Sequence, residues 1–220
     1  MIQKISILLI LLTQFTFAQD AKLSRNSLTI SKVSKEAEFW TWVKNNKTNI
    51  ESILQSHKFV SQLNAKIQSY NELLTFEIGR NKDDKFNFII SCGGIRKGIP
   101  FVKKLVEASK HIDNWNIIAF RQPKEELHTI KENGISIKPK QIKVKYKLIN
   151  KNANLDLYIE GYDGLDQRYI SIAFIFLDNL FGEFFVMNNI NEIAFKPMLG
   201  SESELITLEV LKKQLVKELK

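Results

Sequence analysis

Residues 73–91 read LLTFEIGRNKDDKFNFIIS, and this stretch decides the predicted fold. The apolar residues Leu74, Phe76 and Ile78 alternate with polar ones, which is the pattern of a strand with one buried face. Polar residues at 80–85 form a loop, and the apolar run FNFIIS that follows them returns as a second strand. The stretch therefore predicts a β-hairpin.

A helix and a third strand follow this hairpin. Gly93 and Gly94 end the second strand, and residues 99–109 have the apolar spacing of a helix. The apolar segment NIIAF at 116–120 is a further strand. Residues 73–123 are therefore predicted to form a β-β-α-β unit.

The same order of elements recurs in the second half of the chain, over residues 141–197. IKVKYKLI at 142–149 alternates apolar residues with lysines, and LDLYIEG at 155–161 returns as its partner strand. A helix that is apolar on most sides follows. We predict that GEFFVM at 182–187 and INEIAF at 190–195 are two more strands, joined by a turn of two asparagines.

Matching patterns lie 70 to 75 residues apart in the two units. Residues 74–78 and 144–148 alternate in the same phase, and Ala119-Phe120 recurs as Ala194-Phe195. In both places a cation comes next and a proline follows closely. A period of this length indicates duplication of a supersecondary unit, which would give two ferredoxin-like halves. The alternative is that any two β-β-α-β units look alike once their strands alternate.

The remaining segments are predicted to be helices that pack on these units, together with one linker. A helical segment spans 34–70, and a stripe of leucines predicts a C-terminal helix over 201–219. Residues 124–140 form the linker, in which a short helix is expected at 124–131. The predicted fold class is α+β, in a single domain over 34–220.

The first 18 residues have the order of a signal peptide. Lys4 precedes an apolar run from Ile5 to Leu12 that only Ser6 interrupts, and Ala18 is the small residue before the expected cleavage site. The run is shorter than the ~20 residues that a membrane-spanning helix needs. A buried N-terminal helix is the alternative. We expect export to the periplasm or the extracellular space, with residues 19–33 as a flexible arm.

Composition argues against two classes of partner. Removal of 18 residues from 220 leaves 202, and the loss of Lys4 lowers the formal net charge from +8 to +7. The lysines are spread along the chain without a block of five like charges, so nucleic acid is not an expected partner. No later apolar stretch is long enough to predict a membrane span in the mature chain.

The chain lacks the residues of the common catalytic and metal sites. Cys92 is the single cysteine, so no intramolecular disulfide is possible and the thiol is expected to be buried. The three histidines His57, His111 and His128 do not have metal-ligand spacing. The Walker, dinucleotide-binding and nucleophile-elbow patterns are absent too. We therefore predict no catalytic residue, no metal and no cofactor.

The glycine-rich stretch CGGIRKGIP, residues 92–100, lies between a strand and a helix as phosphate loops do. Arg96 and Arg121 are candidate contacts for an anion there. Trp115 is a candidate ligand contact, because an indole ring can stack on a sugar. The alternatives are a tight turn for the glycines and a place in the core for Trp115.

A second interpretation of Arg121 comes from the strand that precedes it. Both faces of NIIAF are apolar, which predicts an interior strand covered on both sides. Arg121 would then be the first residue to reach solvent, and Pro123 would end the hydrogen-bonded pairing of the strand, because proline has no N–H to donate. In this interpretation the arginine marks a strand end and has no catalytic role.

Three carboxylates are candidates for acid–base chemistry if the protein is an enzyme. Glu160 and Asp163 lie in the loop after the strand at 155–161, at the place equivalent to the glycine turn. Asp178 lies near the end of the apolar helix. Glycoside hydrolysis needs two carboxylates on either side of the scissile bond. The alternative for each is a solvated turn or a helix cap.

Five blocks in order, EFWTWV, LTFEIG, FIISCGGI, NWNIIAFRQP and LDNLFGEFFV, resemble a family of uncharacterised bacterial proteins, a domain of unknown function. Its pattern has an F-W-x-W start, an F-x-I-S-x-x-G-I strand end and a W-x-x-x-x-F-R strand. The match covers most of residues 38–198. The resemblance implies no activity and no site. It implies only that five residues matter to the shared domain: Trp40, Gly94, Trp115, Phe120 and Arg121.

These patterns favour an exported binding or interaction module without a catalytic constellation. Its partner is unknown, and an acidic or glycan ligand outside the cytoplasm is the expected class. Two alternatives stay open. One is a carboxylate-dependent hydrolase that acts on glycans, and the other is a protein that binds a small anion.

Overall fold

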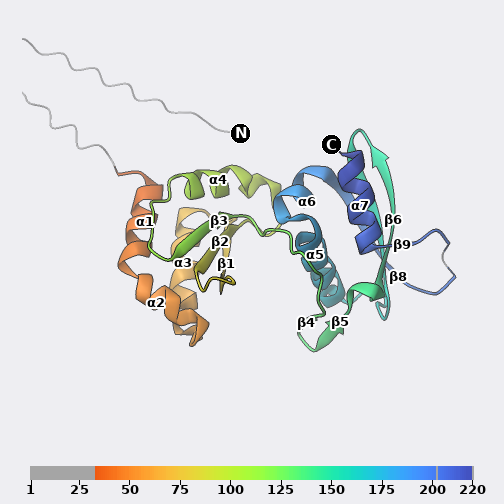
Figure 1. Ribbon diagram of the computed structural model, residues 1–220, viewed down its shortest axis with the longest axis horizontal. Coiled ribbons are helices and arrows are strands. Elements are labelled where there is room, and N and C mark those ends of the chain that lie inside the picture. Colours follow the sequence, from red (N-terminus) through yellow and green to blue (C-terminus); the bar gives the residue numbers. More distant parts are fainter. Residues whose placement is uncertain (1–32, 202, 220) are drawn as a thin grey trace, which may run out of the picture. The chain divides into compact units, whose positions relative to one another are not determined.

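The computed structural model describes residues 33–201 and 203–219. This part of the chain contains seven α-helices and three β-sheets, so the predicted α+β class is confirmed (Figure 1). The predicted signal peptide at 1–18 and nearly all of the predicted arm at 19–33 lie outside the described residues.

The N-terminal helical layer predicted at 34–70 is present. It contains α1 (Lys35–Asn45), α2 (Lys47–Glu51) and α3 (Val60–Tyr70), with two short 3-10 turns between α2 and α3. Ser34 caps α1, because its Oγ accepts a hydrogen bond from the Ala37 N–H at 3.2 Å. The layer covers the first sheet with buried side chains from all three helices, among them Phe39, Val43, Ile50, Leu63 and Ile67.

The first sheet has the order β1-β2-β3, with β1 (Thr75–Arg80), β2 (Phe86–Ser91) and β3 (Trp115–Ala119). β1 and β2 are antiparallel, β2 and β3 are parallel, and α4 (Ile99–Glu107) connects β2 to β3. The predicted β-β-α-β order is confirmed. The prediction that NIIAF is an interior strand is wrong, because β3 lies at an edge of the sheet and most of its residues are half-buried. The interior strand is β2.

The linker at 124–140 holds a β-hairpin where a short helix was expected. β4 (Ile130–Glu132) and β5 (Ile135–Ile137) pair antiparallel across Asn133 and Gly134. Both turn residues have positive φ, 48° and 82°. An Asn-Gly pair adopts this conformation easily and favours a two-residue hairpin. The turn chemistry therefore prevails over the weak helical pattern.

The second sheet has the order β8-β7-β6-β9. Its strands are β6 (Ile142–Ile149), β7 (Asn152–Ile159), β8 (Ile190–Pro197) and the short β9 (Ile206–Thr207). β6 and β7 are antiparallel, and β7 and β8 are parallel, which is the pairing pattern of the first sheet. In both sheets the two parallel strands are direct neighbours, whereas the split βαβ of ferredoxin-like folds separates them. Descent from one duplicated unit stays a prediction.

The segment from 182 to 187, predicted as a strand, is helical. α5 (Gln167–Phe181) ends at Gly182, whose φ is 86°, and α6 (Glu183–Asn189) begins directly after it at an angle of 100°. The buried residues Glu183, Val186 and Met187 recur at the i, i+3, i+4 spacing of a helix face. The prediction failed because the apolar run FFVM does not alternate, and α6 also takes up the expected asparagine turn.

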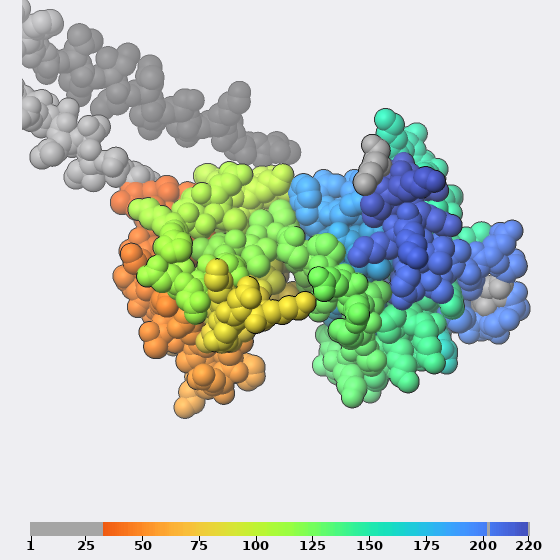
Figure 2. All heavy atoms as spheres, in the orientation of Figure 1, coloured from red at the N-terminus to blue at the C-terminus, as the bar shows by residue number. Residues whose placement is uncertain are grey.

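The C-terminal helix is present, but it begins later than predicted. α7 spans Leu208–Glu218, and Thr207 caps it by accepting a hydrogen bond from the Val210 N–H at 3.3 Å. Residues 206–207 pair with β6, and Glu204 has a φ of 63°, so the helix cannot begin at 201. Leu208, Leu211 and Leu215 are fully buried, and the other side of α7 lies on the surface (Figure 2).

Candidate functional site

A cavity of about 700 Å³ lies beside α5, α6 and β8, next to the glycine turn that follows β2. α5 contributes one complete face to it. Ser171, Phe174, Ile175 and Asp178 have the i, i+3, i+4, i+7 spacing that places residues on a single side of a helix. The other walls come from α6, β8, the glycine turn and Arg121. Their lining residues are Val186, Met187, Ile190, Asn191, Ile193, Gly93, Gly94, Ile95 and Arg96.

The carboxylate of Glu183, the first residue of α6, occupies the glycine turn. Its Oε1 accepts hydrogen bonds from the Ser91 hydroxyl at 2.8 Å, the Cys92 N–H at 3.1 Å and the Gly94 N–H at 3.2 Å. Its Oε2 accepts one from the Arg121 N–H at 3.1 Å. Glu183 is fully buried. The turn that resembled a phosphate loop thus holds a carboxylate of the protein itself.

The Arg121 side chain is ion-paired with two carboxylates. Its Nε donates to Glu77 Oε1 at 2.6 Å and its Nη2 donates to the same oxygen, while Nη1 donates to Asp178 Oδ2. The side chain is only 22 % exposed. The interpretation of Arg121 as a solvent-facing marker of a strand end is therefore wrong. The arginine joins β1 of the first sheet to α5 of the second unit.

Asp178 is set apart from ordinary carboxyls by its surroundings. Burial raises its pKa from the usual 3.8 to about 6, the charge of Arg121 opposes that shift, and the carboxylates of Glu183 and Glu77 add to it. The group therefore exchanges a proton close to neutral pH. Such a pKa beside a cavity is typical of functional sites.

Arg96 supplies a cation at the rim of the cavity. Its Nε donates to the Met187 carbonyl at 2.6 Å, and its Nη2 donates to the carbonyl of Ile190. Within residues 33–201 and 203–219, no carboxylate forms an ion pair with it. Two backbone carbonyls thus hold the guanidinium in place, and its full charge stays available to a ligand.

The cavity brings together three of the six residues singled out from the sequence, namely Arg96, Arg121 and Asp178. Trp115 lies in the first core, where its ring stacks on Phe86 at 4.5 Å and its Nε1–H donates to Glu51 Oε1 at 2.7 Å. The structure therefore favours the core alternative for Trp115.

Glu160 and Asp163 lie on an exposed loop outside the cavity. The Asp163 carboxylate accepts hydrogen bonds from the Leu165 N–H at 2.8 Å and the Asp166 N–H at 2.9 Å. These bonds lower its pKa, so Asp163 behaves as a turn residue.

Sequence reasoning did not select Glu77 or Glu183 as site residues. Glu77 occupies a polar position of an alternating strand, which is where a solvated carboxylate is expected. Glu183 follows the helix-breaking Gly182, so a prediction of α6 would have shown it at a helix start, where carboxylates are favourable. Neither signal identifies the partners of these carboxylates. Arg121, the partner of Glu77, is 44 residues away along the chain, and Ser91, a partner of Glu183, is 92 residues away.

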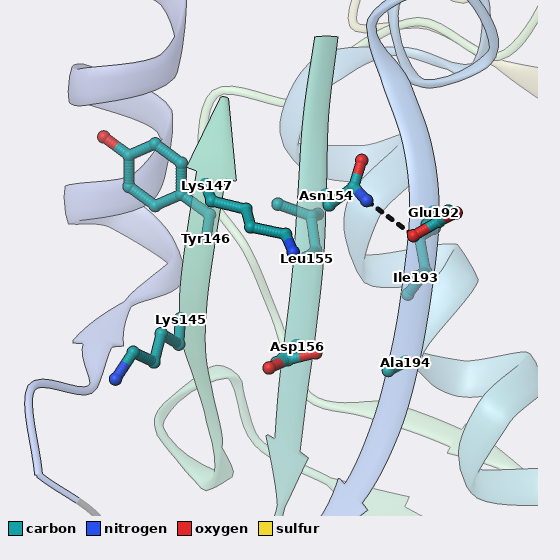
Figure 3. Close-up of a pocket in the computed structure, with 9 residues that line it drawn as sticks. All are labelled: Lys145, Tyr146, Lys147, Asn154, Leu155, Asp156, Glu192, Ile193 and Ala194. Atoms are coloured by element: carbon teal, nitrogen blue, oxygen red, sulfur yellow. Dashed lines mark hydrogen bonds between the residues drawn. The ribbon is translucent and has the colours of Figure 1, made fainter. Parts of the chain in front are cut away.

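A second hollow, of about 470 Å³, lies on the face of the second sheet opposite α5 and α7 (Figure 3). The Asn154 amide donates to Glu192 Oε2 at 2.5 Å, and Lys147 extends over the face toward β7 while Lys145 points away (Figure 3). Lys145 instead pairs with Glu204 at 3.2 Å, and Asp156 pairs with Lys196 at 2.8 Å. The lining holds two lysines and two carboxylates, so its charges balance and this face is the weaker candidate for an anion.

Among the described residues, no group of three or more His, Cys, Asp or Glu side chains could hold a metal ion. No single helix in the same part of the chain is long and apolar enough to cross a membrane, although the bent pair α5 and α6 together has the required length and composition.

Comparison with known proteins gives no match. No family model fits the chain, and no curated protein or solved structure is significantly similar to it. Function is therefore inferred from the cavity and its charges.

Proposed function

We propose that the protein is a binding module for a small amphipathic organic anion, which it holds in the cavity beside α5, α6 and β8. The observation that carries the proposal is the combination of apolar walls with Arg96, a cation that no carboxylate in the described ranges neutralises. An acidic ligand is also one of the two classes expected from the sequence. Membership of the bacterial family that the sequence resembles, and export through the N-terminal segment, remain proposals as well.

The two parts of such a ligand have different roles. Phe174, Ile175, Val186 and Ile190 offer an apolar wall, against which each buried CH₂ of a ligand contributes about 0.8 kcal/mol. The guanidinium of Arg96 fixes the charged end, because it is already oriented by two carbonyls and loses little freedom on binding. A bare inorganic anion would contact Arg96 but not the apolar wall. The backbone N–H groups of the glycine turn that could assist it already bind Glu183.

Isothermal titration calorimetry with two matched probes tests the proposal. We expect the full-length protein to bind 1-octanesulfonate at least tenfold more tightly than 1-octanol, which has the same chain without the charge. Arg96→Met should remove this preference and leave the affinity for octanol unchanged, which shows that the cavity is intact. Lys97→Met, which removes the adjacent exposed cation, should preserve the preference. Equal binding of both probes by the native protein would refute the proposal.

Acid–base catalysis is the second candidate, and the raised pKa of Asp178 is the observation that favours it. Glu183 cannot act as a second carboxylate toward a substrate, because it is fully buried and accepts four hydrogen bonds. A panel of ester, amide and glycoside substrates decides the question. Turnover that disappears in Asp178→Asn would establish an enzyme, and absence of turnover across the panel would leave the binding module.

A further inference from the structure

The second sheet has one long edge strand and one very short one. β8 contains eight residues and, within the described part of the chain, pairs with β7 only, whereas the opposite edge is the two-residue β9. Short edge strands are a common protection against unwanted pairing, and β9 provides that protection on its side. The edge of β8 presents backbone groups that another strand can use, and it borders the cavity through Ile190, Asn191 and Ile193.

α5 has an apolar flank beside this edge. The large apolar side chain of Phe174 is 42 % exposed. Its ring lies against the ring of Phe195 in β8, with 5.3 Å between the ring centroids. Ile175 lies next to it on the same wall of the cavity. A further strand beside β8 would cover both side chains, as the core of the second unit covers the buried side chains of α5.

Arg96 gives this edge a direction. Its Nη2 donates to the carbonyl of Ile190, the first residue of β8, so its positive charge lies at the N-terminal end of the strand. A peptide that pairs antiparallel to β8 would end at this point, with its C-terminal carboxylate next to Arg96. A parallel peptide would place its ammonium group there, and the two positive charges would repel each other.

We propose that the anion bound in the cavity is the C-terminal carboxylate of an extended peptide, which adds to β8 as an antiparallel fifth strand. The inference rests on the proposed function and names its ligand class. Main-chain hydrogen bonds to β8 supply affinity, as in other cases of strand addition. Side chains alternate across a strand, so every second residue of the peptide covers Phe174 and Ile175, and these positions select apolar residues.

The test is affinity capture on the immobilised full-length protein. The probe is a library of N-acetylated hexapeptides in which threonine alternates with valine, leucine, isoleucine or phenylalanine, made with a free carboxylate and, separately, with a C-terminal amide. Mass spectrometry of the retained peptides should show at least tenfold more of the acids than of the amides. Arg96→Met should reduce the acids to the level of the amides, while Lys97→Met should not.

Methylation of the peptide backbone tests strand pairing without changing the protein. In an antiparallel edge, alternate residues direct their N–H groups toward the neighbouring strand. We therefore expect N-methylation at one alternate set of positions in the best peptide to abolish retention, and methylation at the other set to preserve it. Equal effects of both sets would overturn the inference.

The outcomes separate this inference from the function on which it rests. If octanesulfonate binds through Arg96 and no acid peptide is retained, the ligand class is wrong and the proposed function stands. If neither probe binds, both are refuted. If sedimentation shows a stable dimer that the retained peptides do not dissociate, a second copy of the chain occupies the edge and the peptide is not the ligand.

Discussion

The two β-β-α-β units have the same strand pairing and differ in the turn that follows the middle strand. After β2, the turn through Gly93 and Gly94 directs the N–H groups of Cys92 and Gly94 at Glu183, a residue of the other unit. After β7, the carboxylate of Asp163 satisfies the N–H groups of its own turn, and Asp166 caps α5. A turn with its own acceptor needs no partner, whereas a turn without one recruits an acceptor from elsewhere and thereby joins two units.

The largest difference in stability is expected between two variants, each of which removes the carboxylate acceptor of one turn. Glu183→Ala leaves one hydroxyl and three N–H groups without an acceptor, and the Ser91 hydroxyl and the Cys92 N–H among them are buried, so we expect the free energy of unfolding to fall by about 3–5 kcal/mol. Asp163→Ala affects an exposed turn and should leave the urea midpoint almost unchanged. Urea unfolding followed by circular dichroism measures both. Equal losses would show that the two turns contribute alike.

A smaller contrast is expected between the two cations of the repeated Ala-Phe-cation pattern. Arg121→Met removes the shared partner of Glu77 and Asp178, and should lower the free energy of unfolding by about 3 kcal/mol at pH 7. Lys196→Met removes a surface ion pair with Asp156, and should change little. Differential scanning calorimetry of the two variants is the measurement. A large effect of Lys196→Met would show that the pattern has the same role in both units.

The third contrast depends on pH. Because the pKa of Asp178 is about 6 when folded and 3.8 ordinarily, the native state binds the proton more tightly, and this group's contribution to stability declines as pH rises from about 4 to 6. Glu36 in the first helical layer has a pKa lowered to about 2, chiefly by its hydrogen bond with Lys104. Its contribution is present above its ordinary 4.5 and is lost as pH falls toward 2.

Asp178→Asn isolates the first of these groups. Acidification from pH 7 to 4.5 should stabilise the native protein relative to this variant by about 2 kcal/mol. The difference between the two unfolding free energies, measured at several pH values, gives the slope directly. A difference that does not change with pH would mean that Asp178 titrates normally.

Local patterns were sufficient to predict most of the fold. Alternation identified both hairpins, because half-buried strands must place every second side chain in the core. Errors occurred where backbone chemistry decides: Gly182 starts a helix in an apolar run, Asn133-Gly134 forms a hairpin, and Glu204 at positive φ delays α7. These are properties of one or two residues, and an average over a window of residues does not detect them.

The site was predictable only in part. Arg96 and Arg121 were singled out as anion contacts of the glycine-rich stretch, and Asp178 as a carboxylate near the end of the apolar helix. Glu183 was not singled out, because its hydrogen bonds with the glycine turn join residues 89 to 92 positions apart. No local pattern encodes such a pairing, since it depends on how the two units pack together.

The placement of the aromatic core gives the molecule an internal optical reporter. Its three tryptophans are Trp40, Trp42 and Trp115, so all of them lie in the first unit or the helices that cover it, and the second unit has none. Tryptophan emission therefore follows the melting of the first half alone, while the ellipticity of the backbone follows both halves. Coincidence of the two signals would show that the halves unfold as one cooperative unit, and separation of them would show that the halves unfold independently despite the Glu183 link.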